Sequence, residues 1–233
     1  MTTHVKPLVS YVILTYKQEE YIAQCIQGAL SQTYENMEVI ISDDCSPDET
    51  WKVIQETVKN YKGSKKIVIN RNEKNMGLVP HFNHVMFDIA KGVILSGDGG
   101  DDFSNPNRVE KMVEELLNDR SIVCVSGQMD DIDKYGNVIA KNRTGRKIYK
   151  LDDEYIRSFS FMAGGACKDC WRTVLDVFGP LDESTPTEDS TMRFRCLLMG
   201  NILQTEDVIL NYRHLETSLS SPKNRYKRTI LKK

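Results

Sequence analysis

The sequence has no long hydrophobic run. None of its 233 residues lies in an apolar stretch of the roughly 18 or more residues that a membrane-spanning helix needs. The first ten residues, MTTHVKPLVS, also lack the basic and then apolar pattern of a secretory signal peptide. We therefore expect a cytoplasmic protein that forms one domain over residues 1–233.

Charge and cysteine content argue against two further classes. The formal net charge is −2, so the chain carries no overall basic footprint for nucleic acid and we expect no nucleic-acid partner. The six cysteines are scattered, and CxxC spacing occurs only at Cys167 and Cys170. No second CxxC or histidine pair accompanies it, which argues against a zinc site. Without a secretory signal, we expect reduced thiols.

Three nucleotide-handling motifs are also missing. No GxGxxG follows the first expected strand, which disfavours a dinucleotide-binding Rossmann site, and no GxxxxGK[ST] occurs anywhere in the chain. The position directly after that strand holds Thr15 and Tyr16 rather than the aspartate pair of metal-dependent phosphatases.

Short segments rich in valine and isoleucine alternate with helical patterns in the first half of the chain. The second helix is expected to start at Pro47, because Ser46 and Glu49 have the spacing of a capping box. This alternation predicts an α/β fold with a doubly wound, mostly parallel sheet. The expected strands are 8–14, 37–41, 67–70, 93–96 and 122–126, and the expected helices are 21–31, 47–58, 80–90 and 106–117.

The second half of the chain is less regular. A hairpin or loop is expected around Tyr135–Asn137, and Gly200 is expected to stop the last helix. The tail, 216–233, carries many basic residues and is expected to lie at the surface. The other elements expected here are helices at 170–177 and 187–199 and short strands at 202–204 and 208–211.

An acidic turn follows the fourth expected strand. Asp98, Asp101 and Asp102 are spaced by glycines between that strand and the helix after Pro106. Carboxylates crowded in this way repel one another unless a cation lies between them, which suits a divalent metal that holds a phosphate-bearing ligand. For an isolated cluster, however, a polar surface turn is the better interpretation.

The ends of the neighbouring strands favour the metal interpretation. Polar residues follow each of the first four expected strands, namely Thr15 and Tyr16, Asp43 and Asp44, Asn75, and the acidic turn. Ligands of open α/β sheets bind at the carboxyl ends of the strands. We therefore expect these groups to converge on one edge of the sheet.

At this point the chain resembles the family 2 glycosyltransferases of the GT-A fold. The motifs that match are the opening strand with the helix ending in Ser31–Tyr34, the acids and serine of Asp43–Asp48, Asn75–Gly77, the acidic turn, and Glu188–Asp189. The resemblance covers about residues 8–215 and is strongest over 8–110. It implies a nucleotide-sugar-binding half at about 8–127 and an acceptor half at 128–215.

The resemblance also implies roles for single residues. Thr15 and Tyr16 would line the base pocket, although a tyrosine at a strand end is equally well a core aromatic. Asp43 and Asp44 would contact the base and ribose, with turn-forming acids as the alternative. Asn75 would lie near the nucleotide, with a left-handed turn residue before Gly77 as the alternative.

The metal and base assignments come from the same resemblance. Counting back from the proline that follows the motif makes Asp102 a ligand of Mg²⁺ or Mn²⁺ and Asp101 a ribose or metal contact. The family's first acid position then falls on Gly99, and Asp98 and His214 are further candidate ligands. Asp189 would be the catalytic base; its alternative is a first-turn acid that merely stabilises a helix.

The resulting prediction is an inverting, metal-assisted glycosyltransferase of surface polysaccharide or glycan synthesis. Its expected partners are a nucleotide sugar, a UDP-sugar first, and a glycan or lipid-linked acceptor. Basic residues of the tail would contact the inner face of a membrane. A nucleotidyltransferase and a nucleotide-sugar-binding module without activity stay open as alternatives.

Overall fold

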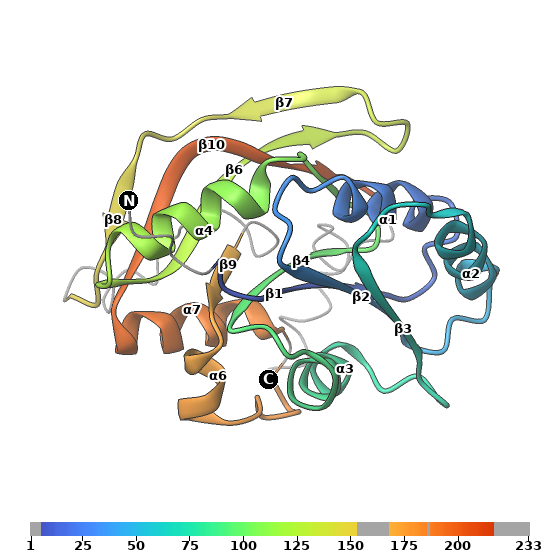
Figure 1. Cartoon of the computed structure of the whole chain (residues 1–233), viewed down its shortest axis with the longest axis horizontal. Coiled ribbons are helices and arrows are strands. Elements are labelled where there is room, and N and C mark those ends of the chain that lie inside the picture. The colour runs from blue at the N-terminus through green and yellow to red at the C-terminus, as the bar shows by residue number, and fades with distance from the viewer. Residues whose placement is uncertain (1–5, 153–167, 186, 217–233) are drawn as a thin grey trace.

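All the strands that the structure describes belong to one mixed sheet. The structure is a computed structural model, which describes residues 6–152, 168–185 and 187–216. The order across the sheet is β3-β2-β1-β4-β9-β6-β10-β5, with β7 beside β6 and β8 beside β10 (Figure 1). Helices cover both faces of this sheet, which confirms the predicted α/β class.

The four strands at one side of the sheet are parallel, as predicted. They are β1 (Val9–Thr15), β2 (Met37–Asp43), β3 (Lys66–Arg71) and β4 (Ile94–Gly99). Their side chains alternate between the faces, so both faces of the sheet are apolar. In β1, for example, Tyr11 and Ile13 enter one core cluster and Val12 enters the other.

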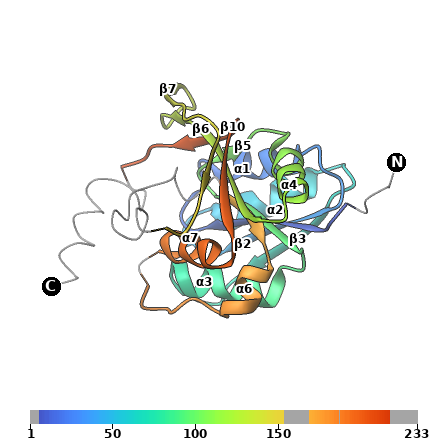
Figure 2. The ribbon, with the colours of Figure 1, turned by 90° about the vertical axis from the view of Figure 1, so that its left-hand side faces the viewer.

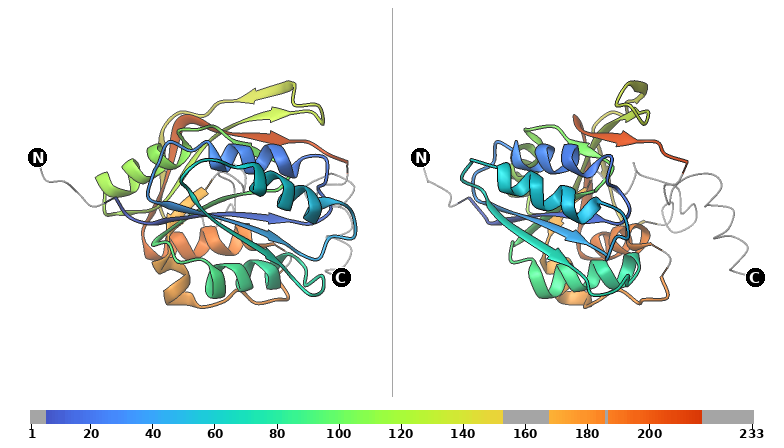
Figure 3. Two further views of the ribbon diagram at one scale, coloured as in Figure 1. Left: turned by 45° about the vertical axis from the view of Figure 1, so that its right-hand side comes forward. Right: turned by 90° about the vertical axis from the view of Figure 1, so that its right-hand side faces the viewer.

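Two helical layers enclose these strands. One face of the sheet is covered by α1 (Ile22–Leu30), α2 (Thr50–Asn60) and α4 (Arg108–Asn118). The other face is covered by α3 (Leu78–His84) with its π-helical continuation η1 (Val85–Ile89), and by α6 (Thr173–Phe178) and α7 (Glu188–Met199) (Figure 3). Strands β1, β2 and β4 end at one edge between these layers.

The remaining strands form the irregular side of the sheet. The longest are β6 (Ile122–Ile132) and β10 (Asn201–Arg213), which pair in parallel. The hairpin of β6 and β7 (Val138–Asn142) stands out from the helical layers (Figure 2). The shorter strands are β5 (Phe103–Ser104), β8 (Lys147–Tyr149) and β9 (Lys168–Trp171), each antiparallel to its partners.

Two predictions for this side were wrong. The helix expected at 170–177 exists as α6 but begins only at Thr173, because Cys170 belongs to strand β9 and pairs with Leu95 of β4 and Cys124 of β6. The short strands expected at 202–204 and 208–211 are one strand, β10, with shifts of register between Gln204 and Leu210. The polar residues between the two segments therefore mark a bulge rather than a break.

Several helix starts also differ from the predictions. α2 begins at Thr50 instead of Pro47, because the Ser46 hydroxyl donates to Asp43 and accepts from the Lys17 amide, and no capping box forms. α4 begins two residues later than expected. The last helix, α7, runs to Met199 and is followed by Gly200, as predicted. Within the described residues, no helix is long and apolar enough to cross a membrane.

Candidate active site at the carboxyl ends of the strands

The ends of the first parallel strands meet at one edge of the sheet. Thr15 is paired in register with Asp43, and Leu14 is paired with Gly99. The Asp44 amide donates to the Thr15 carbonyl at 3.0 Å, which ties the loop after β2 to the end of β1. The polar residues that follow these strands are therefore neighbours, as the sequence predicts.

Two carboxylates of the acidic turn converge beside Gly99. A Cβ atom built on Gly99 would lie 3.0 Å from Asp101 Oδ1 and 3.9 Å from Asp102 Oδ2. The other oxygen of Asp102 accepts a 2.7 Å hydrogen bond from the Arg213 amide. One oxygen of each acid thus borders the space that a side chain at position 99 would fill.

This pair of acids is electrostatically costly without a cation. Burial raises the pKa of Asp102 well above its usual range, and the neighbouring Asp101 charge raises it further. Burial also raises the pKa of Asp101, although Arg213 lowers it. In the described residues, no cluster of three or more His, Cys, Asp or Glu side chains has the geometry of a complete metal site.

Asp98 lies inside the protein rather than on the turn, because β4 extends through it to Gly99. The Tyr11 hydroxyl donates to Asp98 Oδ2, and Arg108 Nη1 lies 2.5 Å from Asp98 Oδ1. Ser104 Oγ lies 2.9 and 3.1 Å from the two carboxylate oxygens. Both oxygens of Asp98 are therefore in contact with protein donors.

Arg213 holds the acidic turn from the opposite side. Its Nε donates to the Asp101 carbonyl at 2.8 Å, and its Nη2 donates to Gln24 Oε1 at 2.7 Å. Its Nη1 lies 3.1 Å from the carbonyls of Asp133 and Lys134 in the β6–β7 hairpin. Because Arg213 is buried, it acts as a bridge between these segments.

The next residue, His214, is half exposed. Its Nε2 lies 3.2 Å from Asp131 Oδ1, and its ring packs edge-on against Tyr212 at 5.2 Å between centroids. This contact gives His214 a partner on β6.

Thr15 and Tyr16 have different surroundings. Thr15 is buried, and its hydroxyl donates to Gln18 Oε1 at 2.6 Å. Tyr16 is 40% exposed, with the Lys17 ammonium 5.1 Å from its ring centroid. The alternative that Tyr16 is a core aromatic is therefore wrong, because its side chain is exposed to solvent at the end of β1.

Asp43 and Asp44 are buried and organise the loops around them. Asp43 accepts from the Ser46 amide at 3.1 Å and pairs with Arg71 at 3.3 Å. Asp44 accepts from the amides of Met76 and Gly77, each at 2.9 Å. Both acids thus fix the loops that follow β2 and β3.

Asn75 and Asn72 complete this arrangement. Asn75 Nδ2 donates to the Asp44 carbonyl at 3.2 Å, and Asn72 Nδ2 donates to the Asp44 carboxylate at 2.7 Å. The left-handed backbone of this turn belongs to Gly77, with φ of 85°, and not to Asn75. The alternative that Asn75 is a left-handed turn residue is therefore wrong.

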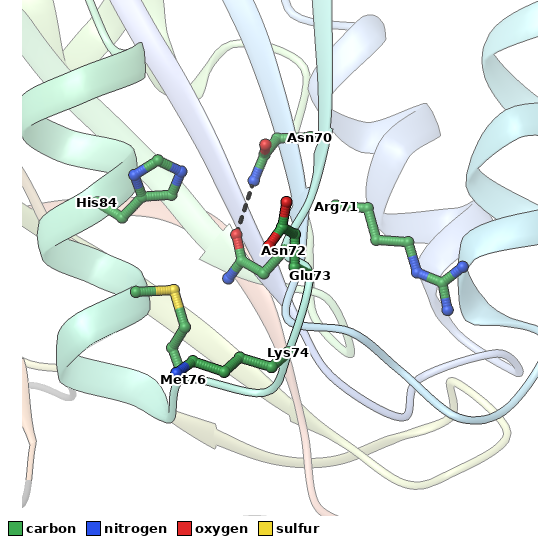
Figure 4. A pocket seen from close by; sticks show the side chains of 7 residues that line it. All are labelled: Asn70, Arg71, Asn72, Glu73, Lys74, Met76 and His84. Atoms are coloured by element: carbon green, nitrogen blue, oxygen red, sulfur yellow. Dashed lines mark hydrogen bonds between the residues drawn. The ribbon is translucent and has the colours of Figure 1, made fainter.

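An open hollow of about 360 Å³ lies beside this loop. Figure 4 shows it between the end of β3 and helix α3, with Met76 and His84 on one side and Arg71 on the other. Asn72 lines the hollow and also bonds to Asp44, so the hollow adjoins the strand edge. Its other lining residues are Asn70, Glu73 and Lys74.

Asp189 lies in the first turn of α7, where the helix dipole stabilises negative charge. Lys168 Nζ of β9 lies 3.3 Å from its Oδ1. Its neighbour Glu188 is partly buried, and Glu188 Oε2 is shielded from solvent without a hydrogen-bond partner. Burial first, and then the charge of Asp189, raise the pKa of Glu188 to about 7.

A family model decides the relationship of this chain to known proteins. Residues 10–176 match the model of glycosyl transferase family 2. The chain belongs to glycosyl transferase family 2. The matched range contains the acidic turn and the strand ends that precede it, whereas Asp189 and Arg213 lie beyond it.

Relatives of known sequence and structure agree with this membership. Chondroitin synthase of Escherichia coli is 34% identical over 134 residues, which are 58% of this chain and 19% of that synthase. TarS of S. aureus with UDP-GlcNAc has a TM-score of 0.70 at 18% identity over 96% of this chain and 64% of its own. A Pyrobaculum calidifontis mannosyltransferase with GDP-Man and Mn²⁺ has a TM-score of 0.71 at 15% identity over 96% and 61%.

These comparisons establish the GT-A fold and show how much of each relative this chain covers. Both solved structures share the fold at low identity, so they support the architecture alone. This family 2 chain spans less than a fifth of the synthase and less than two thirds of either solved chain.

Sequence reasoning missed two charged residues of this family 2 site. Lys168, the partner of Asp189, lies in the segment that was expected to be irregular. Arg108 lies four residues before Met112 on the buried stripe of α4, and a charge on an apolar stripe could have indicated it.

Proposed function

We propose that this chain is an inverting, metal-assisted glycosyltransferase that uses a nucleotide-sugar donor. One observation carries the proposal: Asp101 and Asp102 direct carboxylate oxygens toward the same space beside Gly99, at the edge where β1, β2 and β4 end. Family membership gives this edge its chemistry, because nucleotides bind at the carboxyl ends of such strands.

The donor set at this space suits Mg²⁺ or Mn²⁺. Both ions prefer carboxylate oxygens, and they complete their coordination with water and phosphate rather than with a full protein cage. Asp102 would be the ligand through Oδ2, and Asp101 would contact the ion or the ribose. A bound Mg²⁺ or Mn²⁺ would supply the positive charge that stabilises the leaving diphosphate.

Asp98 and His214 are weaker ligand candidates. Both oxygens of Asp98 already contact Tyr11, Ser104 and Arg108, and His214 pairs with Asp131. We therefore propose a structural role for Asp98 and give His214 no ligand role.

In the transfer step, the acceptor hydroxyl oxygen forms a bond to the anomeric carbon. The bond from that carbon to the diphosphate oxygen breaks, and its electrons leave on the diphosphate. We assign the base that takes the hydroxyl proton to Asp189. Attack on the face opposite the leaving group inverts the anomeric configuration.

The nucleotide would occupy the edge formed by the loops after β1, β2 and β3. Tyr16, which is exposed, would stack on the base, and Thr15 would line the same pocket. Asp43, Asp44 and Asn75 form the floor of this pocket. Because Asp43 and Asp44 are buried and tied into loop hydrogen bonds, we propose that they shape the pocket through the loops that they hold.

We further propose that the product belongs to a polysaccharide or glycan. Chondroitin synthase among the relatives supports a sugar polymer, and TarS with UDP-GlcNAc supports a UDP-sugar donor. The acceptor would be a glycan or a lipid-linked carrier that reaches the edge from 128–185. Membrane contact through the basic tail at a cytoplasmic face also stays a proposal, because 217–233 lie outside the described residues.

A thermal-shift panel with and without Mn²⁺ tests the donor class, because a ligand that binds the folded state raises its apparent stability. The panel contains UDP-sugars, GDP-sugars and nucleoside triphosphates. We expect a shift with one UDP-sugar that depends on Mn²⁺. A shift with triphosphates alone would favour a nucleotidyltransferase instead.

Two substitutions then test the chemistry with the donor that the panel selects. Asp102→Asn is expected to weaken Mn²⁺ binding by ~100-fold, since an ionised ligand is lost. Asp189→Asn is expected to lower kcat by ~100-fold or more while donor binding persists. Asp176→Asn, in an exposed ion pair of α6, is the matched control. Donor binding without any turnover by the wild type would favour the inactive binding module.

A further inference from the structure

A fully buried arginine joins the two parts of the proposed site. Arg108 is the first residue of α4, and its side chain is 0% exposed. Its Nη1 lies 2.5 Å from Asp98 Oδ1, and its Nη2 lies 2.8 Å from Asp169 Oδ1. We refer to Asp98, Arg108 and Asp169 as the Arg108 clamp.

The first arm of the clamp closes the acidic turn. Asp98 directly precedes residues 99–107 and Arg108 directly follows them, so one ion pair joins the two ends of the segment that carries Asp101 and Asp102. Ser104, inside this segment, lies 2.9 Å from Arg108 Nη1 and donates to Asp98. The turn is thus held at both ends and near its middle.

The second arm reaches the segment that carries the proposed base. Asp169 lies in β9, and its Oδ1 accepts hydrogen bonds from Arg108 Nε at 3.3 Å and from Arg108 Nη2. Its neighbour in β9, Lys168, pairs with Asp189 at 3.3 Å. Since β9 is only four residues long, a shift of Asp169 moves Lys168 with it.

The pattern of contacts argues for more than general stability. A guanidinium holds two carboxylates in fixed directions, whereas a lysine ammonium is a flexible point charge. Here the two carboxylates belong to strands β4 and β9, which are antiparallel neighbours in the sheet. The fork therefore sets the distance between the acidic turn and the strand that orients Asp189.

We propose that Arg108 is a positioning residue for glycosyl transfer, with separable arms: Asp98 positions the metal-binding turn, and Asp169 positions the base through Lys168. This inference rests on the proposed function. It adds that metal affinity and turnover depend on different carboxylates of one buried ion-pair network.

The test uses the full chain and three variants. Asp98→Asn and Asp169→Asn keep the side-chain shape and remove one arm each. The control is Glu115→Gln, because Glu115 lies on the same helix as Arg108 and its ion pair with Arg146 is outside the clamp. Mn²⁺ affinity is measured with Mn²⁺ alone by electron paramagnetic resonance, and again in the presence of UDP. Melting temperature, kcat and KM are measured with the selected donor.

The two arms predict different losses. Asp98→Asn is expected to weaken Mn²⁺ binding by about 10- to 100-fold, the range found when an outer partner of a metal ligand is removed. Asp169→Asn is expected to keep Mn²⁺ affinity within about twofold and to lower kcat at least ~10-fold at unchanged donor KM. Arg108→Lys is expected to lower both Mn²⁺ affinity and kcat, and the control Glu115→Gln is expected to change neither.

Other outcomes overturn the proposal. If both variants lower the melting temperature while the folded protein keeps wild-type kcat and Mn²⁺ affinity, the clamp is only structural. Equal losses of Mn²⁺ affinity in both would show that the arms are not separable.

Tyr11→Phe separates a direct metal contact by Asp98 from a positioning role. The hydroxyl of Tyr11 donates to Asp98 Oδ2, and its removal leaves Ser104 as the other donor to that oxygen. Tighter Mn²⁺ binding would indicate a ligand and refute the clamp, whereas positioning predicts weaker binding. A wild type that binds neither Mn²⁺ nor UDP would refute the proposed function itself.

Discussion

Replacing Glu188 with glutamine is expected to stabilise the protein increasingly as the pH rises. Glu188 is partly buried, and its Oε2 is shielded from solvent without a hydrogen-bond partner. Its pKa is raised from 4.5 to about 7, so the folded state binds a proton that the unfolded state has already released at neutral pH. A raised carboxyl pKa contributes stability below the unfolded value, and this contribution is lost as the pH rises through the folded value.

The magnitude follows from the two pKa values. Between about pH 5 and about pH 8, ionisation of Glu188 is expected to remove roughly 2–3 kcal/mol from the free energy of unfolding, at about 1.4 kcal/mol per unit of pKa difference. Glu188→Gln keeps the shape of the side chain without the titration. The stability difference between variant and wild type should therefore grow by this amount across the range.

Urea unfolding at intervals of one pH unit measures this difference. The exposed Glu183→Gln serves as the matched control, and its difference from the wild type is expected to stay flat. Parallel profiles for wild type and Glu188→Gln would refute the assignment, because they would mean that Glu188 titrates alike in both states.

Three further predictions concern other parts of the molecule. Burial lowers the pKa of His81 from 6.5 to about 4, so the wild type should lose roughly 3 kcal/mol as the pH falls from 6.5 toward 4, and urea unfolding of His81→Gln should lack this loss. Gly100→Ala places a Cβ atom 2.7 Å from Thr15 Oγ1, so it should cost about 1–3 kcal/mol in urea unfolding and weaken binding of UDP with Mn²⁺. Arg213→Gln removes donors that hold the Asp101 carbonyl, so Mn²⁺ affinity should fall by ~10-fold in a titration, whereas unchanged affinity would contradict this bridge.

The first half of the fold could be predicted because its signals are local. Each parallel strand there is a short run of valine and isoleucine followed by a helical pattern, and the polar residues that follow the strands meet as expected. Strand β9 could not be predicted in this way. Its sequence, KDCW, has no strand pattern, and its pairing depends on β4 and β6, which lie far away in the sequence.

The candidate site shows the same difference between residues with local signals and residues with distant partners. The sequence pattern placed Asp101 and Asp102 together, and the structure adds that their oxygens share one space. Asp98 has the same residue type and nearly the same position, yet Tyr11, 87 residues earlier in the chain, accounts for its burial. Residue type and spacing do not reveal such a partner, and Lys168 escaped notice for the same reason.

The bridge made by Arg213 also has a consequence for the order of assembly. Its hydrogen bond to Gln24 joins residues that are 189 positions apart in the sequence. Its contacts with the acidic turn can form only after β10, the last described strand, has been made. During synthesis, the segments that carry Asp43 and Asp102 emerge long before β10 can pair beside β6. Because contacts between distant residues require both partners to be present, the nascent chain can form the loops after β2 and β3 early but acquires an organised acidic turn only after β10 has emerged. A ribosome-bound chain that stops before residue 201 should therefore be unable to retain Mn²⁺.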